Sequence, residues 1–171
     1  MPLADAERPE LTLETTRLVA VPASGTLVAQ IQACFEGAPD YFARTEGRPP
    51  GPDEAVHLVA DAEIDGQRRV FALVPRSVGT AVGVLDLHLD YPEPGTAQIG
   101  LLLFREACQG LGYGKETTTA LEQRLAELGF AALRLSVVDE NVEAKAFWER
   151  LGFAVVGALD GGVTVYEKLL R

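Results

Sequence analysis

Three glycines on alternate positions, Gly110, Gly112 and Gly114, stand directly before a helix-forming stretch of the chain. The apolar run before them, which ends at Phe104, is typical of a buried strand. Glycine has no Cβ, so this segment can turn sharply and leave backbone N–H groups uncovered where the helix begins. We therefore expect a strand, a tight loop and a helix in direct succession. The uncovered N–H groups would suit a phosphate group, although the glycines would equally suit a turn that binds nothing.

Two common phosphate-binding motifs do not fit this loop. A Walker loop needs glycine five residues before its Gly-Lys pair and Ser or Thr directly after it, but Gln109 and Glu116 occupy those positions. A dinucleotide fingerprint needs the spacing GxGxxG, whereas this loop has GxGxG. A general anion-binding helix N-terminus remains as the functional interpretation.

The pattern of the whole chain predicts an α+β (mixed α/β) fold in one domain, residues 1–171. The runs expected to be strands are residues 13–23, 68–75, 79–91, 96–104, 131–138, 153–159 and 163–170. The run 96–104 is apolar enough to lie centrally in the sheet. The segments expected to be helical are residues 24–44, as one or two helices, 53–65, the stretch from the glycine loop to Gly129, and 139–152. Residues 45–55, rich in Pro and Gly, are expected to be a loop.

Composition and the cysteine pattern bear on which partners, compartment and metals to expect. The 25 acidic residues outnumber the 15 basic ones, for a net charge of −10, which disfavours nucleic acid or an anionic membrane as a partner and mildly favours a cationic substrate. The N-terminus lacks the layout of a signal peptide, and no apolar run approaches the roughly 18 residues of a membrane span, so we expect a cytoplasmic protein. Cys34 and Cys108 lie far apart without metal-ligand spacing, so we expect free thiols and no metal.

Two segments resemble the GNAT superfamily of acetyl-CoA-dependent N-acetyltransferases. The sequence from Gln109 to Gly114, QGLGYG, is similar to the pyrophosphate loop of that family, (Gln/Arg)-x-x-Gly-x-(Gly/Ala). The sequence NVEAKAFWERLGF, which begins at Asn141, resembles a later family segment in which Asn, Ala, an aromatic residue and Gly-Phe keep this spacing. The first strand-like run and GYGKE further resemble the RimJ/RimL-type branch, which acetylates ribosomal-protein alanines.

The resemblance implies where acetyl-CoA would bind. The fold would be a twisted mixed sheet of about six or seven strands flanked by helices, with two central parallel strands that splay apart. Backbone groups of Leu102 and Phe104 would contact the pantetheine arm, and the N–H near Leu102 would polarise the thioester carbonyl. Asn141 would contact the same arm, unless it only caps the following helix. The other residues that the resemblance assigns to acetyl-CoA are Gln109, Gly110, Leu111, Gly112, Tyr113, Gly114, Lys115, Phe147 and Trp148.

The amine acceptor must attack as a neutral amine. A lysine-like amine with a pKa of about 10.4 costs roughly 4.6 kcal/mol to deprotonate at pH 7, but an α-amine with a pKa of about 8 costs only about 1.4 kcal/mol. A strong base is therefore optional for α-amines. Asp86, His88 and Asp90 share one side of a strand, which makes Asp86 and His88 candidate bases, although such a polar row commonly marks a solvated face.

Trp148 departs from the family pattern. Many relatives carry at this position a tyrosine that is thought to protonate the departing CoA thiolate, and an indole N–H is no proton donor at ordinary pH. Trp148 also lies on a helical stripe with Ala144, Phe147 and Leu151, which is typical of a core position. This departure, with the unclear base, keeps a non-catalytic acyl-CoA sensor as an alternative to an enzyme. A nucleotide-binding interaction module is a third alternative. The enzyme would act on a small molecule or a peptide amine, as a monomer or homodimer.

Overall fold

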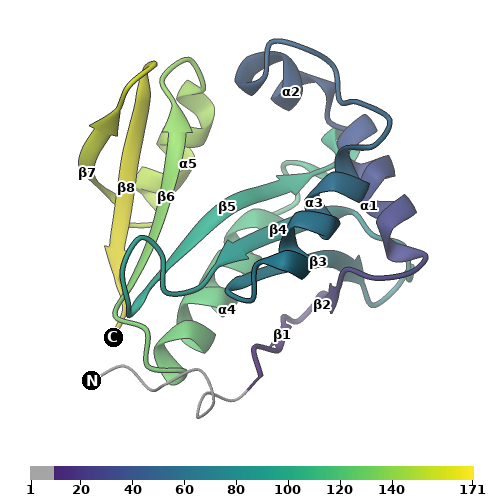
Figure 1. The fold of residues 1–171 in the computed structure, drawn as a ribbon. Helices are drawn as coiled ribbons and strands as arrows, with labels where there is room; N and C mark the ends of the chain where they lie inside the picture. Colours follow the sequence, from purple (N-terminus) through teal and green to yellow (C-terminus); the bar gives the residue numbers. More distant parts are fainter. Residues whose placement is uncertain (1–9) are drawn as a thin grey trace.

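The computed structural model describes residues 10–171 as one open β-sheet with helices on both faces (Figure 1). The expectation that the chain lacks a signal segment rests partly on residues 1–9, which lie outside the described residues. The elements in chain order are β1 Leu13–Glu14, β2 Leu18–Pro22, α1 Leu27–Glu36, α2 Pro39–Thr45, α3 Glu54–Ile64, β3 Arg68–Pro75, β4 Gly83–His88, β5 Thr96–Phe104, the 3₁₀ turn η2 Glu106–Cys108, α4 Tyr113–Glu127, β6 Ala132–Val138, α5 Val142–Arg150, β7 Ala154–Leu159 and β8 Val163–Leu169.

The sheet has eight strands in the order β1-β2-β3-β4-β5-β6-β8-β7, which confirms the mixed fold and the central place of β5. Among these strands only β5 and β6 pair in parallel, and all the other neighbours are antiparallel. The expected six or seven strands became eight because the first run, residues 13–23, is two strands. A turn separates them, in which the Thr15 N–H donates to the Leu18 carbonyl at 2.8 Å.

Apolar side chains cover both faces of the sheet. One core packs α4 and α5 on the face that carries Leu85 and Leu87, and a second core packs α1, α2 and α3 on the face that carries Val84. Because alternate residues of β4 point to opposite faces, Asp86 shares the second, covered face with Val84. Its exposed fraction is 3%. The interpretation of the polar row on β4 as a solvated face is therefore wrong for Asp86.

Two of the helices end just before a glycine, as the sequence predicts. Gly129 and Gly152, with φ of +89° and +90°, follow α4 and α5 as expected. Within residues 10–171 no helix combines the length and the apolar character that crossing a membrane would require.

Candidate functional site

The two parallel strands separate along their length (Figure 1). Thr96–Ile99 of β5 pair with Ala132–Leu135 of β6, and no pairing between these two strands continues beyond Ile99. β5 nevertheless runs on to Phe104 and β6 to Val138. The backbone edge of β5 that faces β6 is therefore open over its last residues, as the expected splay requires.

Two cavities meet at this opening. We call the first the large cleft: its volume is about 1070 Å³, and its walls include the glycine loop, the end of β5 and the start of α5. The second, which we call the small cavity, has a volume of about 320 Å³ and lies between α2 and the separated parts of β5 and β6. Both volumes suit small-molecule ligands. The residues that line both spaces are Tyr41, Leu102, Asn141, Ala144 and Trp148.

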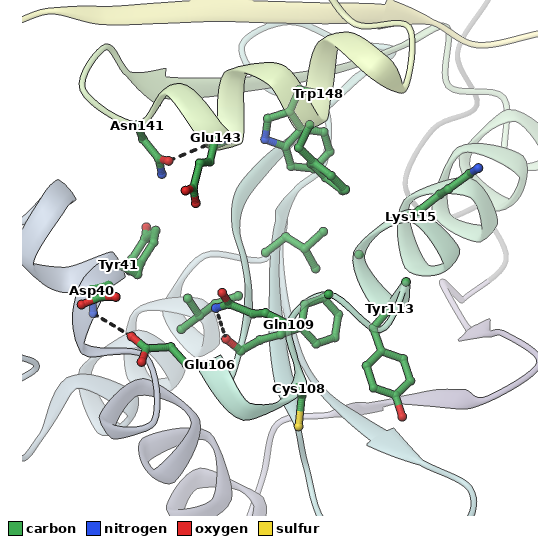
Figure 2. Close-up of a pocket in the computed structure, with 18 of the residues that line it drawn as sticks. Asp40, Tyr41, Glu106, Cys108, Gln109, Tyr113, Lys115, Asn141, Glu143 and Trp148 are labelled. Carbon is green, nitrogen blue, oxygen red and sulfur yellow. Dashed lines mark hydrogen bonds between the residues drawn. The ribbon is translucent and has the colours of Figure 1, made fainter.

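The glycine loop presents backbone to the large cleft. Gly112 precedes the first residue of α4 with φ of +85°, and no side chain caps that helix end. This left-handed conformation favours glycine, and it leaves the first N–H groups of α4 open to a ligand. At Gly114 an added Cβ would lie 3.1 Å from the Phe147 ring, so the loop packs closely on α5. The Gln109 amide donates to the Phe104 carbonyl at 2.9 Å and ties the loop to the end of β5 (Figure 2).

Three other loop residues differ in how they meet the cleft. The Tyr113 ring stacks on Phe104 with centroids 5.8 Å apart, and its hydroxyl points away from the cleft (Figure 2). The Lys115 side chain extends outward along α4 (Figure 2). Leu111 is exposed and, unlike its neighbours, does not line the cleft. Any contribution from these three residues to an anion therefore comes chiefly from their backbone.

The start of α5 forms the opposite wall. The Asn141 side-chain oxygen accepts from the Ala144 N–H at 3.2 Å, so Asn141 caps the helix while it also lines both cavities. Trp148 has an exposed fraction of 7% and packs edge-on against Phe147 and Phe153, with centroids 4.8 and 5.2 Å away. The core assignment of Trp148 is confirmed. The indole nitrogen nevertheless faces the cleft (Figure 2).

Tyr41 is a site residue that the sequence did not reveal. It lies on α2, whose start is pinned beside the glycine loop because the Asp40 N–H donates to the Glu106 carboxylate at 3.0 Å. Its hydroxyl points into the space between α2 and α5 (Figure 2). Burial raises the pKa of the Tyr41 phenol, against a smaller lowering by Thr45, so the hydroxyl keeps its proton at neutral pH. No motif surrounds Tyr41, so only the packing of α2 against the opening identifies it.

One ion pair joins the two walls of the large cleft. Arg44 of α2 and Glu143 of α5 approach to 3.5 Å, and both side chains are largely exposed. Such a pair adds little stability because water screens it. The pair shows that α2 and α5 lie close enough for their side chains to meet across the opening.

The candidate bases, Asp86 and His88, lie on β4, next to Gly100 of β5. Arg68 donates to both oxygens of Asp86 at 2.8 Å, and the His88 Nε2 lies 3.9 Å from the same carboxylate. A Cβ on Gly100 would lie 2.7 Å from Asp86 and 3.2 Å from His88, so glycine lets both groups approach the small cavity, which Gly100 lines. Neither Asp86 nor His88 lines either cavity itself. Asp90 does not continue their row on β4, because it lies in the following turn and accepts from the Gly95 N–H at 2.7 Å.

A sheet that splays at two parallel strands, with a glycine loop at the mouth, matches a known class of enzyme. The model of the "Acetyltransferase (GNAT) family" matches residues 31–153, and the chain belongs to that family. The crystal structure of an acetyltransferase from Thermus thermophilus is similar at 33% identity and a TM-score of 0.79, covering 94% of this chain and 100% of that one.

More distant relatives support the fold. The structure of RimL, a ribosomal L7/L12 alpha-N-protein acetyltransferase in complex with coenzyme A, has a TM-score of 0.76 at 16% identity, over 94% of this chain and 98% of that one. The uncharacterized N-acetyltransferase p20 of Bacillus licheniformis is 24% identical over 90 residues, 53% of this chain and 48% of its own length. The chain thus spans about half of that relative. The likeness to RimL, at 16% identity, shows the fold alone, so the RimJ/RimL-type branch stays a prediction.

Proposed function

We propose that this protein transfers an acetyl group from acetyl-CoA to a primary amine by direct attack in a ternary complex. The observation that carries this proposal is the meeting of a wide cleft, with the glycine loop in its wall, and a small cavity at the opening between β5 and β6. A cofactor arm in the first space and an amine in the second would bring their reacting ends together beside Leu102. Holding two reactants in this way is itself a large source of rate enhancement.

The residues of the large cleft suit coenzyme A. Its pyrophosphate would lie on N–H groups of residues 110–115, where the helix end is positive and has no side-chain cap. The pantetheine arm would run along the open edge of β5 at Leu102 and Phe104, with Asn141, Phe147 and Trp148 on its other side. In this placement the Leu102 N–H stabilises the oxyanion that develops on the thioester carbonyl.

Proton transfer on the acceptor side would use His88. Both oxygens of Asp86 already accept hydrogen bonds from Arg68, so we assign proton acceptance to His88, whose Nε2 would lie 3.2 Å from a Cβ on Gly100. An α-amine with a pKa of about 8 needs little help to become neutral, so water could relay its proton. The net charge of −10 favours a cationic or neutral acceptor over an anionic one.

The departing thiolate needs a proton donor that Trp148 does not supply. Tyr41 faces the junction of the two cavities with its proton retained, so we assign it this role. A CoA thiol, with a pKa of about 8.5 by analogy with cysteine, also leaves fairly readily without help. A protein that binds acyl-CoA without turning it over is the second candidate function, and the tryptophan at position 148 is the observation that favours it.

The deciding experiment measures acetyl-CoA binding by calorimetry and the release of free CoA across a panel of amines. The panel should contain small diamines and matched peptides with basic or acidic first residues. We expect acetyl-CoA to bind and CoA release to be fastest with a basic or neutral amine. Binding without release from any amine would favour the sensor. Failure to bind acetyl-CoA, with binding of ATP instead, would overturn the proposal in favour of a nucleotide-binding module.

A further inference from the structure

Arg17 reaches the glycine loop from the far end of the sequence. It lies in the turn between β1 and β2, and its guanidinium carbon stands 4.3 Å from the centroid of the Tyr113 ring. Its Nη2 lies 3.4 Å from the position that a Cβ on Gly112 would take. Arg17 is not part of the lining of the large cleft, although Gly112 and Tyr113 are. The guanidinium therefore stands just behind the loop that would hold the pyrophosphate.

One neighbour fixes the orientation of Arg17. Glu116, in the first turn of α4, accepts from the Arg17 backbone N–H at 3.1 Å and from its Nε at 2.8 Å, and it also accepts from the Thr15 hydroxyl. Burial alone would raise the pKa of Glu116, but these hydrogen bonds outweigh it and lower that pKa. The pairing uses the Nε side of the guanidinium. The Nη groups take no part in it, and the Arg17 side chain is 43% exposed.

A cation beside this loop would strengthen its binding of an anion. The chain carries a net charge of −10, and the Glu116 carboxylate lies one turn into the helix at which phosphates would dock. Lys115 extends outward along α4 (Figure 2). Arg44 pairs with Glu143 across the cleft. Arg17 both compensates Glu116 and offers further donors beside Gly112. Guanidinium groups suit phosphate because their donors form a planar fork.

We propose that Arg17 is a phosphate-binding residue for the nucleotide end of coenzyme A, with its Nη groups donating to a phosphate oxygen beside Gly112. The inference rests on the proposed function, because it requires coenzyme A in the large cleft. It assigns a binding role to the turn between β1 and β2, which lies about a hundred residues before the loop. The hydrogen bond to Glu116 holds the guanidinium in place before the ligand arrives.

The test compares CoA affinity, measured by calorimetry, in Arg17→Gln and in a matched control, Arg76→Gln. Arg76 steadies the same turn, through Glu14 at 3.0 Å and the Thr15 carbonyl at 3.1 Å, and its loss changes the net charge equally. We expect Arg17→Gln to weaken CoA binding about tenfold, and Arg76→Gln to change it less than twofold. The loss should shrink at high salt, where water and ions screen the pair.

Two further arms separate direct contact from indirect effects. Arg17→Gln should leave the affinity for S-acetylpantetheine, which has no phosphate, unchanged, and the double variant Arg17→Gln/Glu116→Gln should stay weakened toward CoA. Equal weakening toward S-acetylpantetheine, recovery of CoA affinity in the double variant, or unchanged CoA affinity in Arg17→Gln would each overturn the inference. Dephospho-CoA, which lacks the 3′-phosphate, then identifies the phosphate that Arg17 contacts. If Arg17→Gln weakens the binding of dephospho-CoA less than that of CoA, the contact is to the 3′-phosphate. If it weakens both equally, the contact is to the pyrophosphate. If wild type itself fails to bind CoA, the proposed function fails instead.

Discussion

The large cleft and the small cavity differ in the kind of residues that line them. The cleft is walled at its mouth by backbone: glycines at alternate positions, an uncapped helix end and the open edge of β5. The small cavity is lined by residues of α2, β5, β6 and α5, with Gly100 as the one glycine among them, and the buried Arg68–Asp86 pair lies beside it. Backbone N–H groups can bind an anion without any one required side chain, whereas a side-chain cavity fits an acceptor through the identity of its side chains. The donor site therefore depends mainly on backbone conformation, and the acceptor site on which side chains are present.

The strongest test of the backbone-built site is Gly112→Asp. A carboxylate about 4 Å from a phosphate near the protein surface costs about 4 kcal/mol, so acetyl-CoA affinity should fall on the order of a thousandfold. Calorimetry on the folded variant measures this. Gly129→Asp is the control, because Gly129 also has a positive φ, of +89°, but lies outside both cavities. Affinity near that of wild type in Gly112→Asp would remove the loop from the site.

A second test asks whether Asp86 serves the fold or the reaction. Its carboxylate and the Arg68 guanidinium are largely buried and 2.8 Å apart, so Asp86→Asn should lower the free energy of unfolding by about 3 kcal/mol. Denaturant unfolding measures the loss, and Glu14→Gln, which breaks an exposed pair with Arg76, should cost less than about 1 kcal/mol. The turnover of folded Asp86→Asn should stay within a few-fold of wild type. A hundredfold loss of turnover with little loss of stability would make Asp86 the base instead.

The same contrast explains what the sequence could and could not predict. Positive-φ glycines and alternating apolar runs are local signals, so the glycine loop, the order of the elements and the helix ends after Gly129 and Gly152 were predictable. The acceptor side depends on contacts between segments far apart in the sequence. Tyr41 reaches the opening only because Glu106 anchors α2, and the Asp86 face is covered only because helices pack on it. Contacts of this kind cannot be predicted from the pattern of any one segment of the sequence.

Tyr41→Phe tests whether the side-chain wall contributes to the chemistry. It removes one hydroxyl from the junction, and we expect the turnover rate to fall about thirtyfold while the KM for acetyl-CoA stays within twofold. This is below the usual range for a general acid, because a thiol of pKa about 8.5 leaves readily. Burial raises the pKa of Tyr41, so its proton is retained and the ratio of wild-type to variant rates should be flat from pH 6 to about 9.

The control for Tyr41 is Tyr91→Phe, since Tyr91 lines neither cavity and its exposed ring lies beside His88, with centroids 5.6 Å apart, a contact that phenylalanine can keep. Its turnover should match wild type. A twofold or smaller change in the turnover of Tyr41→Phe would assign Tyr41 to lining the cavity. A large rise in the KM for the amine alone would make it an acceptor contact.

The smallest effect is expected at Trp148, where both regions meet. The indole is packed between Phe147 and Phe153, so its aromatic body stabilises the wall while its N–H faces the cleft. Trp148→Phe keeps most of that body, and turnover at saturating acetyl-CoA should fall less than tenfold, about 1.4 kcal/mol of barrier. Trp148→Tyr should be active at or above the wild-type rate, because a phenol at this position adds a second proton donor. Trp148→Ala should instead lose about 3 kcal/mol of stability through the cavity it creates. A loss far beyond tenfold in folded Trp148→Phe would mean that the indole N–H takes part in the reaction, and the proton would then not come from Tyr41 alone.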